Sequence, residues 1–164
     1  MKNKVAFLLI GVIPLLSSCA SQRVFLAPVG PNPFQTTVAS ANTGYLKVFS
    51  EREAISEGDT PIFYQHSEYQ VYNASGKLVK DVGNTSGHYD TAPETVPLPP
   101  GRYTVKARAK DYLSVVVPVV IDAGRTTSLH LDDRWQPPKS SPKTEFVFEP
   151  GGEPVGWRAG RSDR

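Results

Sequence analysis

The chain has 164 residues, with 18 Lys and Arg against 16 Asp and Glu, one cysteine and 15 prolines. So small a net charge argues against a nucleic-acid-binding protein, which needs a dominant basic surface, and a single cysteine excludes a disulfide within the chain. The length suits one domain with extensions and is too short to fit two domains comfortably.

Residues 1–19 have the pattern of a bacterial export signal. Lys2 and Lys4 precede an apolar run from Val5 to Leu16, which is too short to span a bilayer stably. The run ends in Leu16-Ser17-Ser18-Cys19, which resembles the lipobox of bacterial lipoproteins. The resemblance implies cleavage before Cys19 and attachment of lipid to its thiol. The alternative is an ordinary secretory signal that leaves Cys19 as a free thiol.

The residue after this cysteine resembles that of outer-membrane lipoproteins. Ala20 stands where an aspartate usually signals retention in the inner membrane. Two or more acyl chains hold a protein firmly on a membrane. We therefore expect a lipid-anchored envelope protein, on the outer membrane and facing the periplasm if the cell is Gram-negative. Cleavage also removes Lys2 and Lys4, which leaves 16 basic and 16 acidic residues and so no polybasic membrane arm.

Composition separates the two flanks from the middle of the chain. Residues 19–43 are rich in Pro, Ser, Thr and Asn and predict a lipidated tether with a reach of roughly 25 to 30 Å. Residues 134–164 are rich in Pro and Gly and predict a mostly disordered tail. Within this tail, residues 145–148 could add a strand to a sheet edge. Trp157 is a possible anchor for a partner, the alternative being a disordered end.

The middle of the chain, residues 44–133, predicts an all-β domain, because short runs of β-branched and aromatic residues alternate with turn residues. Residues 51–60 are polar and acidic and predict a loop. Pro118 should bend its strand, place it at an edge or split it. About seven strands in about 90 residues predict a single small β-sandwich, Ig-like or transthyretin-like. The expected strands are 45–49, 69–72 and 77–82 (a hairpin), 102–110, 113–121, which could form two short strands, and one around 129–131; residues 96–101 should lead into the strand at 102–110.

Motifs in this middle region are similar to those of PEGA-type and carboxypeptidase-regulatory-like surface domains. They are Leu98-Pro99-Pro100-Gly101-Arg102-Tyr103-Thr104-Val105, Asp111-Tyr112, and the stretch from Gly124 to Leu131. The resemblance covers about residues 44–131 and implies a non-catalytic β-sandwich of the bacterial envelope. The chain departs from the pattern at Asp111, where a glycine is expected, and at 50–54, which lack the proline and glycine of the family turn.

The residues capable of catalysis or metal binding are scattered. His66, His88 and His130 show neither His-x-x-x-His nor Glu-x-x-His spacing, so we expect no metal site and no cofactor. Gly87-His88-Tyr89-Asp90 could bring an imidazole beside a carboxylate, and an enzyme would require His88 or Asp90. The favoured alternative is a solvated loop. We therefore expect a protein that is not an enzyme.

One row of cations stands out on the strand predicted at 102–110. Arg102, Lys106, Arg108 and Lys110 fall on its outward face, where alternate residues lie about 7 Å apart. This face could bind an anionic surface polymer or an acidic partner. The alternative is a solvated face neutralised by nearby acids, since residues 44–133 hold nine basic and twelve acidic side chains.

Two functions remain open at this point. The favoured one is a non-catalytic envelope lipoprotein that contacts another envelope protein or a surface polymer. The alternative is a periplasmic inhibitor or ligand-binding lipoprotein that acts on a hydrolase through loop 85–95. Disulfides often brace such inhibitory loops, and this chain cannot form one.

Overall fold

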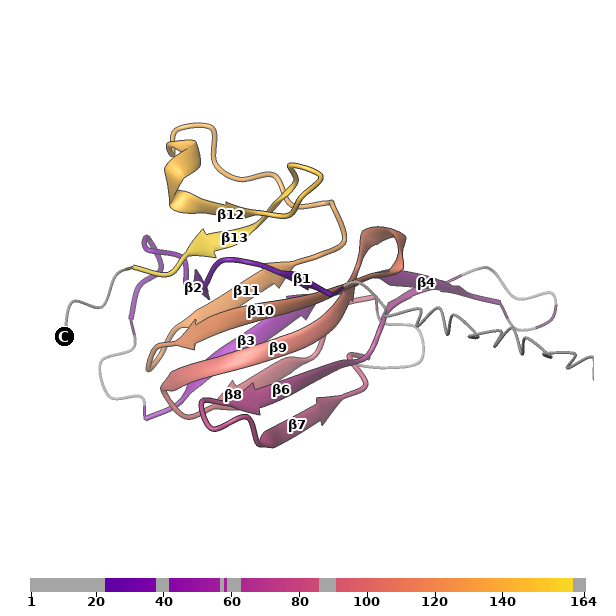
Figure 1. Ribbon diagram of the computed structural model, residues 1–164, viewed down its shortest axis with the longest axis horizontal. Coiled ribbons are helices and arrows are strands. Elements are labelled where there is room, and N and C mark those ends of the chain that lie inside the picture. Colours follow the sequence, from indigo (N-terminus) through magenta and orange to yellow (C-terminus); the bar gives the residue numbers. More distant parts are fainter. Residues whose placement is uncertain (1–22, 38–41, 57, 59–62, 86–90, 161–164) are drawn as a thin grey trace, which may run out of the picture.

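The fold is a two-layer β-sandwich, which confirms the all-β prediction (Figure 1). The computed structural model describes residues 23–37, 42–56, 58, 63–85 and 91–160. Eight strands form the larger sheet: β1 (Val24–Phe25), β2 (Val29–Gly30), β6 (Tyr69–Asn73), β7 (Leu78–Val82), β9 (Gly101–Ala109), β10 (Leu113–Ile121), β12 (Phe146–Phe148) and β13 (Pro154–Arg158).

The larger sheet has the order β12-β13-β2-β10-β9-β6-β7, and β1 also pairs with β10. The predicted hairpin of β6 and β7 is confirmed, with Gly76 at a φ of 79° in its turn. Long antiparallel pairing between β9 and β10 forms the middle of this sheet, from Leu113 opposite Ala109 to Ile121 opposite Gly101.

The smaller sheet covers one face of the larger one and has the order β11-β3-β8. A separate hairpin of β4 and β5 projects from one end of the sandwich (Figure 1). Residues 52–55 are therefore a strand, and the prediction of a loop over 51–60 is wrong there. The bounds are β3 (Gly44–Phe49), β4 (Arg52–Ile55), β5 (Phe63–His66), β8 (Thr95–Leu98), β11 (Thr126–His130), and the short 3-10 helices η1 (Lys110–Tyr112) and η2 (Lys143–Glu145).

The core lies between the two sheets and follows the alternation of the strands. Val105, Ala107 and Ala109 of β9 are buried, while Lys106 and Arg108 between them are only partly buried. Leu46 and Leu129 of the smaller sheet are completely buried in the same cluster. Alternation in the sequence therefore predicts correctly which face of each central strand is apolar.

The corner between β9 and β10 explains one departure from the family pattern. Asp111 has φ 60° and ψ 30°, which is the left-handed conformation that a glycine adopts easily. Aspartate tolerates this conformation better than most other side chains do. The aspartate therefore takes the backbone shape that the glycine of the motif would provide.

Pro118 neither splits β10 nor places it at an edge. The strand runs unbroken from Leu113 to Ile121, and Pro118 pairs with Thr104 of β9. On its other side, β10 pairs with β1 at Val115 and with β2 at Val119. The gap between these two short strands lies beside Pro118, which has no N–H to donate.

Both predicted domain boundaries are wrong, because segments from each flank belong to the larger sheet. β1 and β2 pair in parallel with β10, and β13 pairs with β2. The strand expected near 145–148 is confirmed as β12, but it is followed by β13, where a disordered tail was expected. Burial of Val29, Phe146 and Val155 offsets the cost of ordering these segments. The folded domain thus extends from Val24 to Arg158.

Candidate functional site

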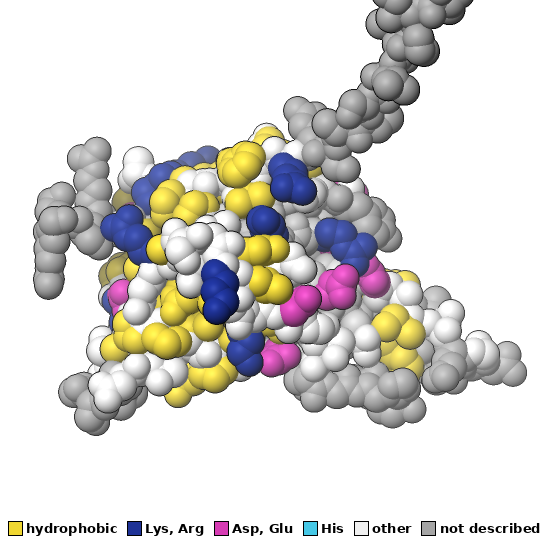
Figure 2. All heavy atoms as spheres, turned by 60° about the horizontal axis from the view of Figure 1, so that its bottom comes forward, with side chains coloured by type: hydrophobic (Ala, Val, Ile, Leu, Met, Phe, Trp, Pro, Cys, Tyr) yellow, Lys and Arg dark blue, Asp and Glu magenta, His cyan; other side chains and the backbone are white. Residues whose placement is uncertain are grey.

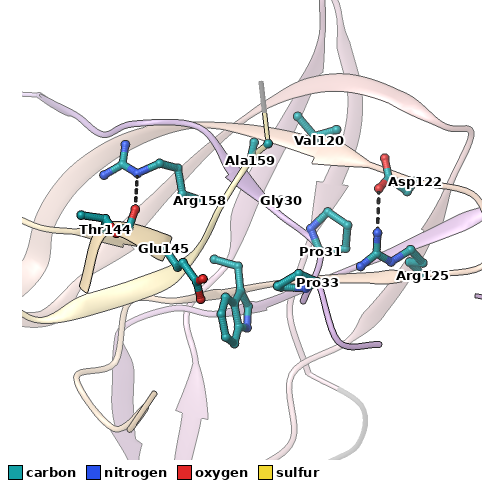
Figure 3. A pocket seen from close by; sticks show the side chains of 12 residues that line it. Gly30, Pro31, Pro33, Val120, Asp122, Arg125, Thr144, Glu145, Arg158 and Ala159 are labelled. Carbon is teal, nitrogen blue, oxygen red and sulfur yellow. Dashed lines mark hydrogen bonds and ion pairs between the residues drawn. The ribbon is translucent and has the colours of Figure 1, made fainter. Parts of the chain in front are cut away.

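A hollow of about 670 Å³ lies where four segments of the chain meet (Figure 3). The segments are the end of β2 with the prolines that follow it, the end of β10 with its turn, η2, and the end of β13. Three of them come from the flanks of the chain, and sequence alone could not predict that they meet. The hollow is lined by Gly30, Pro31, Pro33, Val120, Asp122, Arg125, Thr144, Glu145, Trp157, Arg158, Ala159 and Gly160.

One wall of this pocket is held by Arg125. Its guanidinium forms an ion pair with Asp122 at 3.3 Å and donates a hydrogen bond to the carbonyl oxygen of Asn32. These contacts tie the turn after β10 to the segment after β2. The Nε–H of Arg125 is buried and has no acceptor in the described part of the chain. It is therefore a buried donor without a protein partner in the wall of the hollow.

The opposite wall is held by Arg158. Its Nε donates to the carbonyl oxygen of Thr144 at 3.1 Å, and its terminal nitrogen donates to that of Phe146 at 3.0 Å. The carboxylate of Glu145 points into the hollow (Figure 3), and its Oε2 is buried without a partner among the described residues. Two residues that line the pocket thus each hold a buried polar atom without a partner among the described residues.

Trp157 contributes to the interior, which corrects its interpretation as an exposed partner anchor. Only 6% of this residue is exposed. Its ring lies 4.8 Å from that of Phe146, 6.2 Å from that of Trp135 and 5.6 Å from that of Phe34, measured between ring centroids. The side chain packs β13 against the rest of the protein and leaves little surface for a partner.

Two histidines that are distant in the sequence come together beside the smaller sheet. The ring of His130 is stacked between Phe49, at 4.3 Å, and Trp135, at 4.9 Å. Burial, and secondarily the charge of His66, lowers the pKa of His130 from 6.5 to about 4. His66 is also buried, and its Nδ1 donates to the carbonyl oxygen of Ser50 at 2.8 Å. Neither contact could be read from residues so far apart in sequence.

A hollow of about 390 Å³ lies beside these histidines. Asp132 lines it, and burial is the largest cause of the raised pKa of this carboxyl. Its Oδ1 has no hydrogen-bond partner in the described part of the chain. No group of three or more His, Cys, Asp and Glu among the described residues is arranged to hold a metal ion.

The predicted row of cations is interrupted. Arg102, Lys106 and Arg108 lie on the outward face of β9, whereas Lys110 belongs to η1, beyond the end of the strand. Arg108 pairs with Glu53 and Lys110 with Asp133, while the ammonium of Lys106 lies 4.0 Å from the ring centroid of Tyr72. Figure 2 shows Lys and Arg side chains separated by hydrophobic ones on the side of the molecule near β7. The face does not present a continuous basic surface.

Several predicted residues fall outside the described part of the chain. They include the lipobox with Cys19 and Ala20, and the pair His88 and Asp90. Loop 85–95 is described only at 85 and from 91 onward. Within the described residues, no helix is both long enough and apolar enough to cross a membrane.

No protein-family model, curated protein or solved structure matches this chain.

Proposed function

We propose that this protein is a lipid-anchored, non-catalytic lipoprotein of the bacterial cell envelope that binds another envelope component. The observation that carries the proposal is the arrangement at the N-terminus. An export signal and a lipobox end at Cys19, and a folded β-sandwich begins only five residues later, at Val24. Ala20 supports an outer-membrane location that faces the periplasm.

A binding role is supported by the pocket between β2, β10 and β13. It is lined by acidic and basic side chains, among them Glu145 and Arg125, which could bind a polar group of a partner. The motif resemblance to PEGA-type domains also favours a binding module.

A protein partner fits better than an anionic polymer. The ion pairs of Arg108 with Glu53 and of Lys110 with Asp133 reduce the positive charge available on the face of β9. A polymer of repeated negative charges would need several free cations in a row. Near the pocket, the side chain of Phe34 is 71% exposed and apolar. Aromatic side chains of this kind are enriched at protein interfaces.

The lipid anchor is tested by replacing Cys19 with Ala in the full chain. We expect this variant to leave the membrane fraction, because no acyl chain can then be attached. Ser18→Ala is the matched control, since it keeps a small residue before the cysteine and should leave the protein membrane-bound. Retention of Cys19→Ala on membranes after a carbonate wash would contradict the proposal.

The binding role is tested by photo-crosslinking in cells. A benzophenone amino acid at Phe34, beside the pocket, should give one discrete protein adduct that mass spectrometry can identify. The same probe at Leu78, which is 43% exposed on β7, is the control. Only diffuse background at Phe34 would argue against a binding module that uses this end of the sandwich.

A further inference from the structure

The folded domain begins so close to Cys19 that it cannot stand far from the membrane. Five steps along the backbone separate Cys19 from Val24, the first residue of β1. Even a fully extended chain covers about 17 Å over five such steps. A lipid on Cys19 would therefore hold the start of β1 within this distance of the lipid headgroups.

The strand pairing shows which end of the sandwich is held there. Val24 pairs with Val115, near the start of β10 and the corner after β9. The N–H of Glu51 donates to the carbonyl oxygen of Arg108 at the same corner, which places the base of the β4–β5 hairpin there. We call this the anchored end, comprising the start of β1, the β9–β10 corner and the β4–β5 hairpin (Figure 1).

The pocket lies at the other end, which we call the far end. It includes the last residues of β10 and the turn that contains Asp122 and Arg125. From Val115 to Ile121, the strand covers about 20 Å. The N–H of Tyr45 donates to the carbonyl oxygen of Arg125, so the start of β3 also belongs to the far end.

The anchored end carries exposed side chains of a kind found at membrane interfaces. Phe25 is 74% exposed, Tyr64 is 46% exposed and Ile55 is 40% exposed. Aromatic rings favour the boundary between headgroups and acyl chains, and tyrosine is enriched there. Two ion pairs nearby, Arg108 with Glu53 and Lys110 with Asp133, each have a net charge of zero. The guanidinium of Arg52 lies 5.1 Å from the ring centroid of Tyr64, so a contact made here would combine aromatic rings with one cation.

We propose that the anchored end rests on the membrane, with Phe25 and Tyr64 in the interfacial layer. The pocket at the far end then faces away from the membrane and is open to a partner. This inference rests on the lipidation of Cys19 proposed above. It adds an orientation and a membrane-contacting surface to that function.

The single cysteine of the chain makes this orientation measurable. Lipidation uses the thiol of Cys19, so one introduced cysteine is the only free thiol. Tyr64→Cys at the anchored end and Tyr45→Cys at the far end are matched variants, because the two tyrosines are 46% and 40% exposed. Phe25→Cys is a second probe of the anchored end and lies on a different strand. Each lipidated full-length variant is labelled with a nitrobenzoxadiazole dye.

The labelled proteins are placed in vesicles of phosphatidylethanolamine and phosphatidylglycerol that carry a nitroxide on the headgroup. Dyes at residues 64 and 25 should lose emission by at least about twofold, because an interfacial side chain lies at the depth of the headgroups. The dye at residue 45 should be unaffected.

The outcomes separate this inference from the proposed function. Equal quenching at residues 64 and 45, stronger quenching at 45, or no quenching at both 64 and 25 would overturn the orientation while the protein remains on the vesicles. If Cys19 in the unmodified chain reacts with maleimide and the protein does not float with the vesicles, the lipid anchor itself is refuted.

Discussion

The central strands and the short flanking strands are held in the sandwich by different means. β9 and β10 have nine residues each, alternate in burial over much of their length and pair with each other throughout. The flanking strands have two to five residues, and β12 and β13 are held largely by packing among Phe146, Trp135 and Trp157. The composition of a proline-rich segment indicates how much it costs to order that segment. It does not show whether contacts with distant parts of the chain offset this cost.

Trp157→Ala tests most directly whether the C-terminal flank is integral to the fold. The side chain is 6% exposed, and removing a buried tryptophan typically costs about 3 to 5 kcal/mol. We expect a loss of this size in the free energy of unfolding, measured by urea titration of the mature chain carrying Cys19→Ala. Trp157→Phe, which keeps an aromatic ring, should lose less. A change near zero for Trp157→Ala would mean that the flank is dispensable.

The pH dependence of stability tests the packing of Trp135 on His130 of the smaller sheet. Since the pKa of His130 is lowered from 6.5 to about 4, the unfolded chain takes up a proton at pH values where the folded chain does not. The contribution to stability is complete above pH 6.5 and is lost as the pH falls toward 4, at most about 3 kcal/mol in full. The raised pKa of Asp132 acts in the opposite direction and reduces the observed change.

The measurement is urea unfolding across the interval from pH 6.5 to 4. His130→Phe keeps a ring between Phe49 and Trp135 and removes the titrating group, so its stability should fall less steeply with pH. Trp135→Ala should expose His130 and bring its pKa back toward 6.5. Parallel pH profiles for the wild-type chain and His130→Phe would contradict the assignment to this histidine.

Gly156→Ala tests the close approach of β13 to both sheets. A Cβ at this position would lie 2.7 Å from Cγ1 of Val29 and 3.0 Å from the carbonyl oxygen of Ser128. Such overpacking typically costs about 1 to 3 kcal/mol. Gly83→Ala is the control, because nothing lies within 4 Å of a Cβ there. Thermal melts should show a lower midpoint for Gly156→Ala, and equal midpoints for the two variants would mean that β13 shifts freely.

Phe34→Ala should have the smallest effect on stability. The side chain is 71% exposed and meets Trp157 edge to face at a centroid distance of 5.6 Å. Such an aromatic pair contributes about 1 kcal/mol. We expect a loss of that size or less in a urea titration. A loss as large as that of Trp157→Ala would show that Phe34 has a mainly structural role.

The sequence predicts well those parts of the fold that local patterns encode. Alternation locates β9 and its buried face, and turn residues such as Gly76 and Gly124 locate the reversals of the chain. It misses β4, because Arg52 and Glu53 give a polar strand whose hairpin projects from the sandwich. β1 and β2 are too short for any periodicity, and they pair with residues about ninety positions farther along the chain.

The candidate site was less predictable than the fold. Its lining comes from four separate segments, and the unmet groups on Arg125 and Glu145 are defined only by the packing around them. The row of cations is visible in the sequence, but its partners Glu53 and Asp133 lie on other segments of the chain. A residue type indicates which interactions a side chain can form, and the fold determines whether a neighbouring residue already forms them.

The position of β2 has a consequence for the order in which the molecule assembles. This strand comes second in the chain, yet it lies between β10 and β13, and Gly30 pairs with Trp157. During synthesis, β2 therefore cannot pair until β10 has been made, and its other edge stays unpaired until β13 has been made. Such long-range closure slows folding. A chain that stops before Pro154 would therefore leave one side of β2 without a strand partner, even though every residue of β2 is present.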